Sequence, residues 1–196
     1  MSDVKPAQPA DAIALLKADH REVDALFTQF ERASGDSARV EIVSRICQAL
    51  STHATIEEKV FYPAARGVLG KDDQDLVDEA QVEHGSLKDL MKKLRGGNAS
   101  SPQFEALVTV LKEYVQHHVK EEESEFFPKV QQRGLDGAAV GAQLQSLKAR
   151  LAKRTSPAAH GRVSFVSAPS RARSTTRRTT GAARTSTSTA SAASRN

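Results

Sequence analysis

Six residues that can bind metal ions stand where a helical protein normally places leucine. Apolar residues in four segments recur at alternating intervals of three and four, which is the spacing of a helix face that packs into a bundle core. Histidines and glutamates interrupt these apolar faces at His20, His53, Glu57, His84, His118 and Glu122. His53 and Glu57 lie four residues apart, as do His118 and Glu122, so each pair shares one face of its helix.

Ionisable groups inside an apolar core require compensating charge, because a buried carboxylate or imidazole without a partner lowers stability. Neutral imidazoles are good ligands for transition-metal ions, and carboxylates can bridge two of them. The pattern therefore predicts a two-metal centre with these six side chains as its ligands. The alternative is a structural bundle whose polar core residues bind no metal, which would require the six positions to match by coincidence.

An internal repeat supports the two-metal interpretation. The first segment matches the third after a shift of 64 residues, which places His20 on His84. The second segment matches the fourth after a shift of 65 residues, which also places Pro63 on Pro128. One helical hairpin is used twice, so a bundle with approximate two-fold symmetry is expected.

The fourth segment contains a rival histidine–glutamate pair. His117 also has a glutamate four residues on, at Glu121. The repeat favours His118, because His117 corresponds to Thr52, which lies about 100° away from the core-facing side of the helix. We therefore interpret His117 as a solvated residue or as one that supports the site from outside the ligand shell.

Four further carboxylates adjoin the predicted ligands in sequence. Asp19 and Glu83 each precede a histidine, and Glu58 and Glu123 each follow a glutamate. Such groups can orient an imidazole N–H, but we expect them to be surface charges. The aromatic residues beside the repeated prolines are expected to serve in packing: Tyr62 and Phe127.

The spacing of apolar residues places the predicted ligands on four helices joined by short turns. Glycines and a proline break the pattern at Gly35, at 67–70 and at 96–102. The expected fold is all-α, an up-down-up-down four-helix bundle followed by a short C-terminal helix and a disordered tail. The helices are expected at about 11–32, 37–65, 73–95 and 102–130, with the short one at about 138–153.

Charge separates the expected bundle from the tail. All 24 acidic residues lie at or before Asp136, so the chain carries −7 up to that point and +11 after it. The last part is rich in Ser, Thr, Arg and Ala, with little apolar surface to offset the entropy of ordering. A solvated tail is favoured over weak, nonspecific nucleic-acid contact. The expected division is a flexible lead-in at 1–10, the bundle at 11–136, the short helix at 137–153 and a disordered basic tail at 154–196.

Nothing in the sequence predicts export or membrane insertion. Cys47 is the single cysteine, which excludes an intramolecular disulfide. The N-terminal residues lack the basic and apolar pattern of a signal peptide. No apolar stretch approaches the roughly 20 residues that span a bilayer. We therefore expect a cytoplasmic protein without a membrane partner.

The chain resembles the hemerythrin-like, HHE cation-binding domains. The resemblance covers about residues 11–130 and is carried by DHREVDALF, HATIEEKVFYP, EHGSLKDLMKKL and HHVKEEESEFFP. It implies a bundle with a non-haem di-iron site and the same six residues as ligands. Lys88 stands four residues after His84, so the fifth histidine of the marine-worm oxygen carriers is absent. The pattern is closer to the four-His, two-Glu sites of the iron–sulfur-repair di-iron proteins.

The resemblance also implies a cofactor of two iron ions joined by an oxo or hydroxo bridge, with manganese or zinc ranked below iron. Structural zinc sites usually contain thiolates, which this site lacks. Open positions on iron would bind O2, NO or peroxide. Binding or sensing is favoured, and the alternatives are a di-iron enzyme that decomposes peroxide and an iron donor in iron–sulfur cluster repair. No nucleophile or organic-substrate motif is visible in the sequence.

Overall fold

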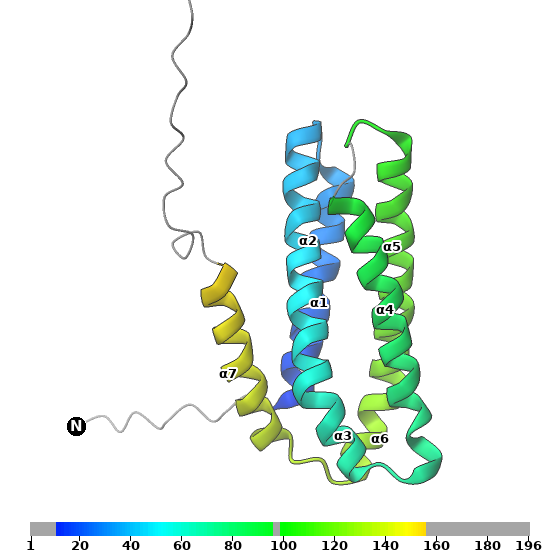
Figure 1. Ribbon diagram of the computed structural model, residues 1–196, viewed down its shortest axis with the longest axis vertical. Helices are drawn as coiled ribbons and strands as arrows, with labels where there is room; N and C mark the ends of the chain where they lie inside the picture. Colours follow the sequence, from blue (N-terminus) through cyan, green and yellow to red (C-terminus); the bar gives the residue numbers. More distant parts are fainter. Residues whose placement is uncertain (1–10, 96–98, 156–196) are drawn as a thin grey trace, which may run out of the picture. The chain divides into compact units, whose positions relative to one another are not determined.

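The computed structural model describes residues 11–95 and 99–155, and its regular elements within these ranges are all helical. The four bundle helices lie side by side, and a further helix lies against α1 (Figure 1). The all-α four-helix prediction is confirmed. The expected lead-in, and the basic tail from residue 156 onward, lie outside the described residues. The long helices are α1 (Ala12–Arg32), α2 (Asp36–Ile56), α4 (Asp75–Arg95), α5 (Pro102–Glu121) and α7 (Gly137–Thr155).

Two of the bundle helices continue through a widened turn into a shorter helix. α2 runs through the π-helical turn η1 (Glu57–Phe61) into α3 (Tyr62–Val68). α5 runs through the equivalent turn η3 (Glu122–Phe126) into α6 (Phe127–Gln132). A short 3-10 turn, η2 (Lys71–Asp73), precedes α4. The sequence pattern predicted continuous helices over both stretches, so the two π turns are additions that the pattern did not show.

The repeated prolines give a physical reason for the two π turns. A proline inside an α-helix has no N–H to donate, and its ring clashes with the carbonyl four residues earlier. Pro63 and Pro128 stand two residues after the ends of the widened turns, where the N–H groups of Tyr62 and Phe127 donate to carbonyls five residues back. The wider turn thus accommodates each proline without ending the helix. Each π turn begins at a predicted ligand, Glu57 or Glu122.

Local capping interactions fix where the bundle helices begin. The Asp11 side chain accepts hydrogen bonds from two backbone N–H groups of the first turn of α1. Ser101 caps α5 in the same way, and Pro102 occupies the first turn, where no N–H is required. Gly134 follows α6 with a φ of 83°, a conformation that residues with a side chain rarely adopt.

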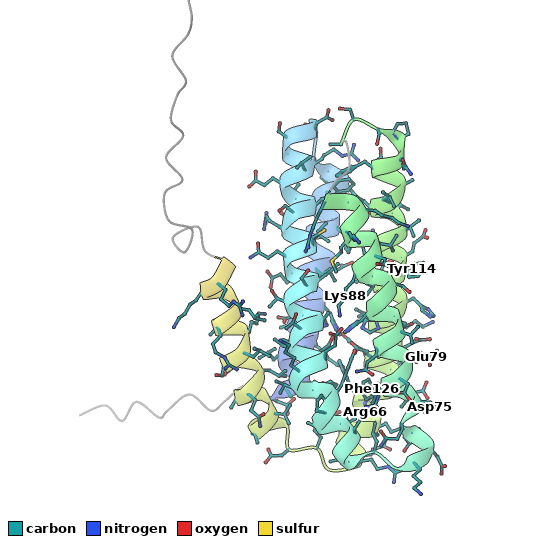
Figure 2. All side chains as sticks on the ribbon, in the orientation of Figure 1. Arg66, Asp75, Glu79, Lys88, Tyr114 and Phe126 are labelled. Carbon is teal, nitrogen blue, oxygen red and sulfur yellow. The ribbon has the colours of Figure 1, made fainter. Side chains whose placement is uncertain are left out.

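The ends of the bundle near the short helices are held by polar contacts. Arg66, labelled in Figure 2, extends from α3 to α4 and donates to Asp78 Oδ1 at 2.5 Å and to Gln81 at 3.2 Å. Asp73 in η2 pairs with Lys129 at 2.9 Å and with Arg133 at 2.8 Å. These contacts link α3 to α4, and they link η2 to α6 and to the residue that follows it.

The hydrophobic core consists of two clusters. One contains Leu16, Ile56 and Phe126, and the other contains Val23, Leu50 and others from α1, α2, α4 and α5. Along α1, His20 lies between Leu16 of the first cluster and Val23 of the second. A layer of polar residues therefore separates two apolar halves of the bundle.

Helix α7 packs against α1, α2 and η1. Val140 and Leu144 of α7 are buried in the same cluster as Leu16. The helix begins and ends within two residues of the bounds that the sequence predicted. Within the described ranges, every helix is too short or too polar to cross a bilayer.

Candidate metal centre

The six predicted ligands come together in one buried layer. All six are 0–6% exposed. His20 and His84 lie near the middle of α1 and α4, His53 and His118 lie in the last turns of α2 and α5, and Glu57 and Glu122 stand at the starts of the π turns. Each of the six side chains is buried because its residue lies on the apolar face of its helix, as the spacing predicted.

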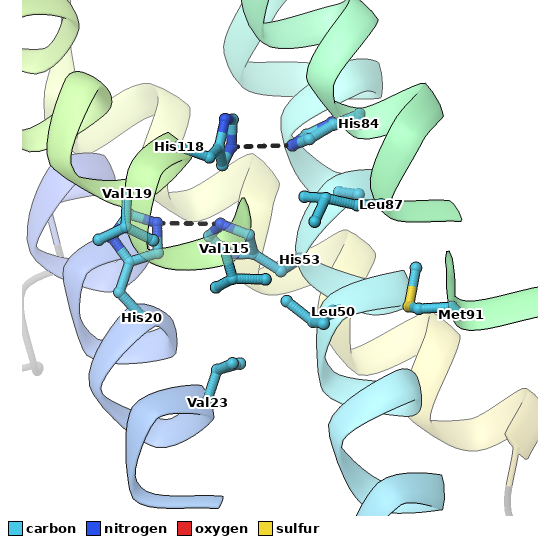
Figure 3. Close-up of a pocket in the computed structure, with 11 residues that line it drawn as sticks. His20, Val23, Leu50, His53, His84, Leu87, Met91, Val115, His118 and Val119 are labelled. Atoms are coloured by element: carbon cyan, nitrogen blue, oxygen red, sulfur yellow. Dashed lines mark hydrogen bonds between the residues drawn. The ribbon is translucent and has the colours of Figure 1, made fainter. Parts of the chain in front are cut away.

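The four imidazoles form two pairs that meet through their Nε2 atoms (Figure 3). His20 Nε2 lies 3.0 Å from His53 Nε2, and His84 Nε2 lies 3.1 Å from His118 Nε2. Each pair joins the two helices of one hairpin. The internal repeat relates the two pairs, so the centre has the expected two halves.

Two glutamates connect the two halves. Glu57 Oε2 lies 3.2 Å from His53 Nε2 and 3.3 Å from His84 Nε2. Glu122 Oε2 lies 3.3 Å from His20 Nε2 and 3.6 Å from His118 Nε2. Each carboxylate therefore reaches one imidazole of each pair, which is the placement of a bridging ligand.

The outward-facing nitrogen of each imidazole has a carboxylate neighbour. His20 Nδ1 lies 2.8 Å from Glu123, and His84 Nδ1 lies 3.0 Å from Glu58. These two glutamates, which we expected to be surface charges, are 31% and 29% exposed and bond to the imidazoles. The expectation was wrong because both side chains reach an imidazole on a neighbouring helix.

Asp19 and Glu83 were also expected to be surface charges, and this expectation was wrong as well. Glu83 lies 2.6 Å from His118 Nδ1, and Asp19 lies 3.7 Å from His53 Nδ1. A histidine that donates its Nδ1–H to a carboxylate has its lone pair on Nε2, which fixes the ring as a metal ligand.

The donor set fits metal ions. With the protons on Nδ1, the two Nε2 atoms of a pair present lone pairs to each other, an arrangement that only a cation between them stabilises. Ligand atoms at right angles, each about 2.1 Å from one metal ion, are about 3.0 Å apart, which is the separation observed in both pairs. Both oxygens of Glu57 and Oε2 of Glu122 are buried and accept no hydrogen bond from the described residues.

The side chains also interact electrostatically without metal. Burial opposes protonation of His53, but the carboxylates of Glu57, Asp19 and Glu122 outweigh it and raise the pKa of His53 to about 10. Burial likewise disfavours ionised Glu57, yet His53 and neighbouring His84 hold its pKa well below the usual range. Binding of a metal ion to Nε2 of His53 must therefore displace a proton.

Tyr62 is a polar contributor to the site that the sequence analysis missed. Its hydroxyl donates to Glu122 Oε1 at 3.2 Å and lies 3.3 Å from His84 Nε2. Burial and the carboxylates of Glu57 and Glu122 raise its pKa, so the hydroxyl keeps its proton. Tyr62 and its counterpart in the repeat, Phe127, are both buried in the core, as expected, and the ring of Phe127 stacks on His20. The repeat has a tyrosine at position 62 and a phenylalanine at the equivalent position 127. This difference in the sequence could have indicated a polar role for Tyr62.

The rival pair of the fourth helix lies outside the buried layer. His117 is 65% exposed, and its Nε2 lies 3.2 Å from Glu121 and 3.9 Å from Glu83. The prediction from the repeat that His118, and not His117, points into the core is therefore confirmed.

Comparison with known proteins agrees with this arrangement. The family model described as the hemerythrin HHE cation-binding domain matches residues 11–130. This chain belongs to the hemerythrin HHE family. Its matched segment contains all six buried residues of the layer. Together with the clusters of histidine and glutamate, membership of a cation-binding family supports metal binding by this chain.

Relatives of this HHE protein include longer proteins. It is 32% identical over 117 residues to a DNA nickase of Nostoc, covering 59% of this chain and 32% of the relative. It is 24% identical over 110 residues to an uncharacterized hemerythrin-like protein of Schizosaccharomyces pombe, covering 56% of this chain and 54% of that one. The chain therefore spans about a third and about half of the lengths of these two relatives.

A solved structure shares the fold. It is the crystal structure of a hemerythrin HHE cation-binding-domain protein from Mycobacterium kansasii, with a TM-score of 0.63 and 20% sequence identity. The match covers 72% of this chain and 87% of that one. At this identity, the likeness shows that the two chains share the helical architecture.

The outer carboxylates give a first testable prediction. Glu123→Gln is expected to weaken metal binding by about 10–100-fold, because the imidazole of His20 loses the partner that holds its Nδ1 proton. Competition with a coloured chelator measures the change. Glu125→Gln, on the same π turn but exposed, serves as the matched control and should bind metal like the native protein. Equal affinities for the two variants would contradict the role of Glu123.

Proposed function

We propose that this chain is a non-haem di-iron protein whose four-histidine, two-glutamate centre binds O2, NO or peroxide. The observation that carries the proposal is the position of Glu57 in both groups of converging ligand atoms. It meets His20, His53 and Glu122 in one group and His84 and His118 in the other. A carboxylate common to two groups is the expected ligand of two ions held close together.

The proposed metal ligands are His20, His53, Glu57, His84, His118 and Glu122. Iron held by these residues would supply redox-active coordination positions that the protein leaves open. The chain's own groups would orient the ligands. Glu123, Glu58 and Glu83 lie within hydrogen-bond distance of the Nδ1 atoms of three of the four histidines. Tyr62 donates to Glu122. An all-nitrogen and oxygen set without thiolate suits iron better than a structural zinc ion.

A small apolar cavity adjoins the imidazole pairs (Figure 3), and its size favours a small ligand. Its volume is about 20 Å³, whereas a single water needs about 10–15 Å³. It therefore has room for a molecule the size of O2 or NO, and an organic substrate does not fit. Besides the four histidines, its walls are Val23, Leu50, Ala54, Leu87, Met91, Val115 and Val119.

The proposal is tested with iron-loaded protein under controlled gas. The reduced protein is expected to change its absorption on exposure to O2 or NO, and the oxidised protein is expected to show the near-ultraviolet bands of a bridged ferric pair. An oxygen electrode measures turnover of added hydrogen peroxide. Ligand-dependent spectra with slow turnover support binding or sensing. Rapid oxygen evolution would instead support the enzyme alternative, and spectra that do not respond to any of the ligands would contradict the proposal.

A cavity-filling variant separates ligand access from metal binding. Ala54→Val adds two methyl groups at the cavity wall and is expected to reduce the affinity for NO by about tenfold or more, since overpacking a small void costs roughly 1–3 kcal/mol. The iron content should not change. Ala49→Val on the same helix, which does not line this cavity, is the control and should bind NO like the native protein.

A further inference from the structure

The two halves of the centre differ in how their outer carboxylates are engaged. Asp19 and Glu83 occupy equivalent positions in the repeat, each beside a histidine of the partner helix. Glu83 lies 2.6 Å from His118 Nδ1, but Asp19 lies 3.7 Å from His53 Nδ1. The other outer pair is closely matched, with 2.8 Å for His20 and 3.0 Å for His84. The asymmetry is therefore local to Asp19.

A lysine of α7 contacts the Asp19 side chain. Lys148 donates to Asp19 Oδ1, and the Asp19 side chain is only 10% exposed, whereas the Lys148 side chain is 38% exposed. Helix α7 follows the repeat in the chain and lies beyond residues 11–130, which match the family model. Buried Val140 and Leu144 dock this helix against the bundle. In the other half, Lys88 contacts Glu58, but its side chain is 48% exposed and Glu58 stays 3.0 Å from His84 Nδ1. Of these two lysine contacts, the one from Lys148 accompanies the longer distance between carboxylate and imidazole.

We propose that Lys148 is a positioning residue that acts through Asp19 on His53 and makes the two metal positions unequal in affinity. The inference rests on the proposed two-metal function. A carboxylate that accepts the Nδ1–H of an imidazole strengthens the bond between Nε2 and a metal ion. Lys148 draws the charge of Asp19 towards α7, so His53 is a weaker ligand than His118. The position held by His84 and His118 therefore fills first.

The test uses the full chain and Co²⁺, whose visible absorption reports each bound ion. The native protein is expected to bind two Co²⁺ ions in two distinct steps. Lys148→Gln should release Asp19 to His53, tighten the weaker step by about tenfold and bring the two steps together. Lys148→Arg keeps the charge and should retain the separation. Lys153→Gln, at an exposed position on the same helix, should behave like the native protein.

A double-mutant cycle shows whether Lys148 acts through Asp19. Asp19→Asn should weaken the second step, and adding Lys148→Gln to that variant should change it no further. The inference is overturned if Lys148→Gln leaves the weaker step unchanged, or if it has the same effect with and without Asp19. Failure of the proposed function gives a different result, because the native chain would then bind fewer than two Co²⁺ ions.

Discussion

Replacing Glu57 with glutamine is expected to reduce the metal content from two ions per chain to one or none. Glu57 is fully buried and contributes to both groups of ligand atoms, whereas each histidine contributes to one. The neutral amide keeps the size of the side chain but loses the negative charge and one ligand oxygen. Mutating a residue that only hydrogen-bonds to a metal ligand weakens metal affinity by up to about 100-fold. Because Glu57 is itself a proposed ligand, its loss should weaken the affinity for the two ions by more than that.

Elemental analysis and circular dichroism together measure this effect. The helical signal of Glu57→Gln should remain that of the native protein, so that metal loss is not a consequence of unfolding. Glu41→Gln changes an exposed glutamate of the same helix and should retain two ions. If folded Glu57→Gln retained two ions with native affinity, Glu57 could not be the ligand shared between them.

Removing the metal is expected to lower the melting temperature by about 10 °C or more. Ligand binding at 1,000 times the dissociation constant stabilises a fold by about 4 kcal/mol, and each kcal/mol shifts the melting temperature by roughly 2–4 °C for a domain of this size. In the metal-free state, buried oxygens of Glu57 and Glu122 have no hydrogen-bond partner among the described residues. Calorimetry before and after chelation, followed by metal addition, measures the shift.

The shift should depend on pH in a defined direction. Metal binding requires imidazoles without a proton on Nε2, and the neighbouring carboxylates raise the pKa of His53 to about 10 and also raise that of His118. Metal must therefore displace protons throughout the neutral range, and its stabilising effect should decrease as the pH falls. A melting temperature that is the same with and without metal would contradict the placement of ions in the buried layer.

The sequence was sufficient for the fold and for the six core-facing polar residues. Each of them interrupts an apolar face with a regular period, so burial follows from the position in the helix alone. The repeat also distinguished His118 from His117, because only one of two adjacent residues can point towards the core. These inferences need only local spacing and one internal comparison.

The surroundings of the imidazoles could not be predicted in the same way. Glu123 and its partner His20 are 103 residues apart in the sequence, and their contact depends on how α1 packs beside the helix that contains Glu123. Tyr62 reaches the centre from the end of the same kind of turn. The position of Lys148 depends on how α7 docks, which the periodicity of α7 does not specify. Such contacts depend on the relative placement of helices, which spacing within one helix does not determine.

Two transition-metal ions are expected to occupy the layer between the two apolar halves of the bundle. The most direct test is elemental analysis of protein purified without chelators and then reconstituted with ferrous iron under argon, combined with Mössbauer spectroscopy of the ⁵⁷Fe-loaded sample. Two iron ions per chain with the spectrum of a coupled pair are expected. Folded protein that retains no stoichiometric metal after reconstitution would contradict the claim.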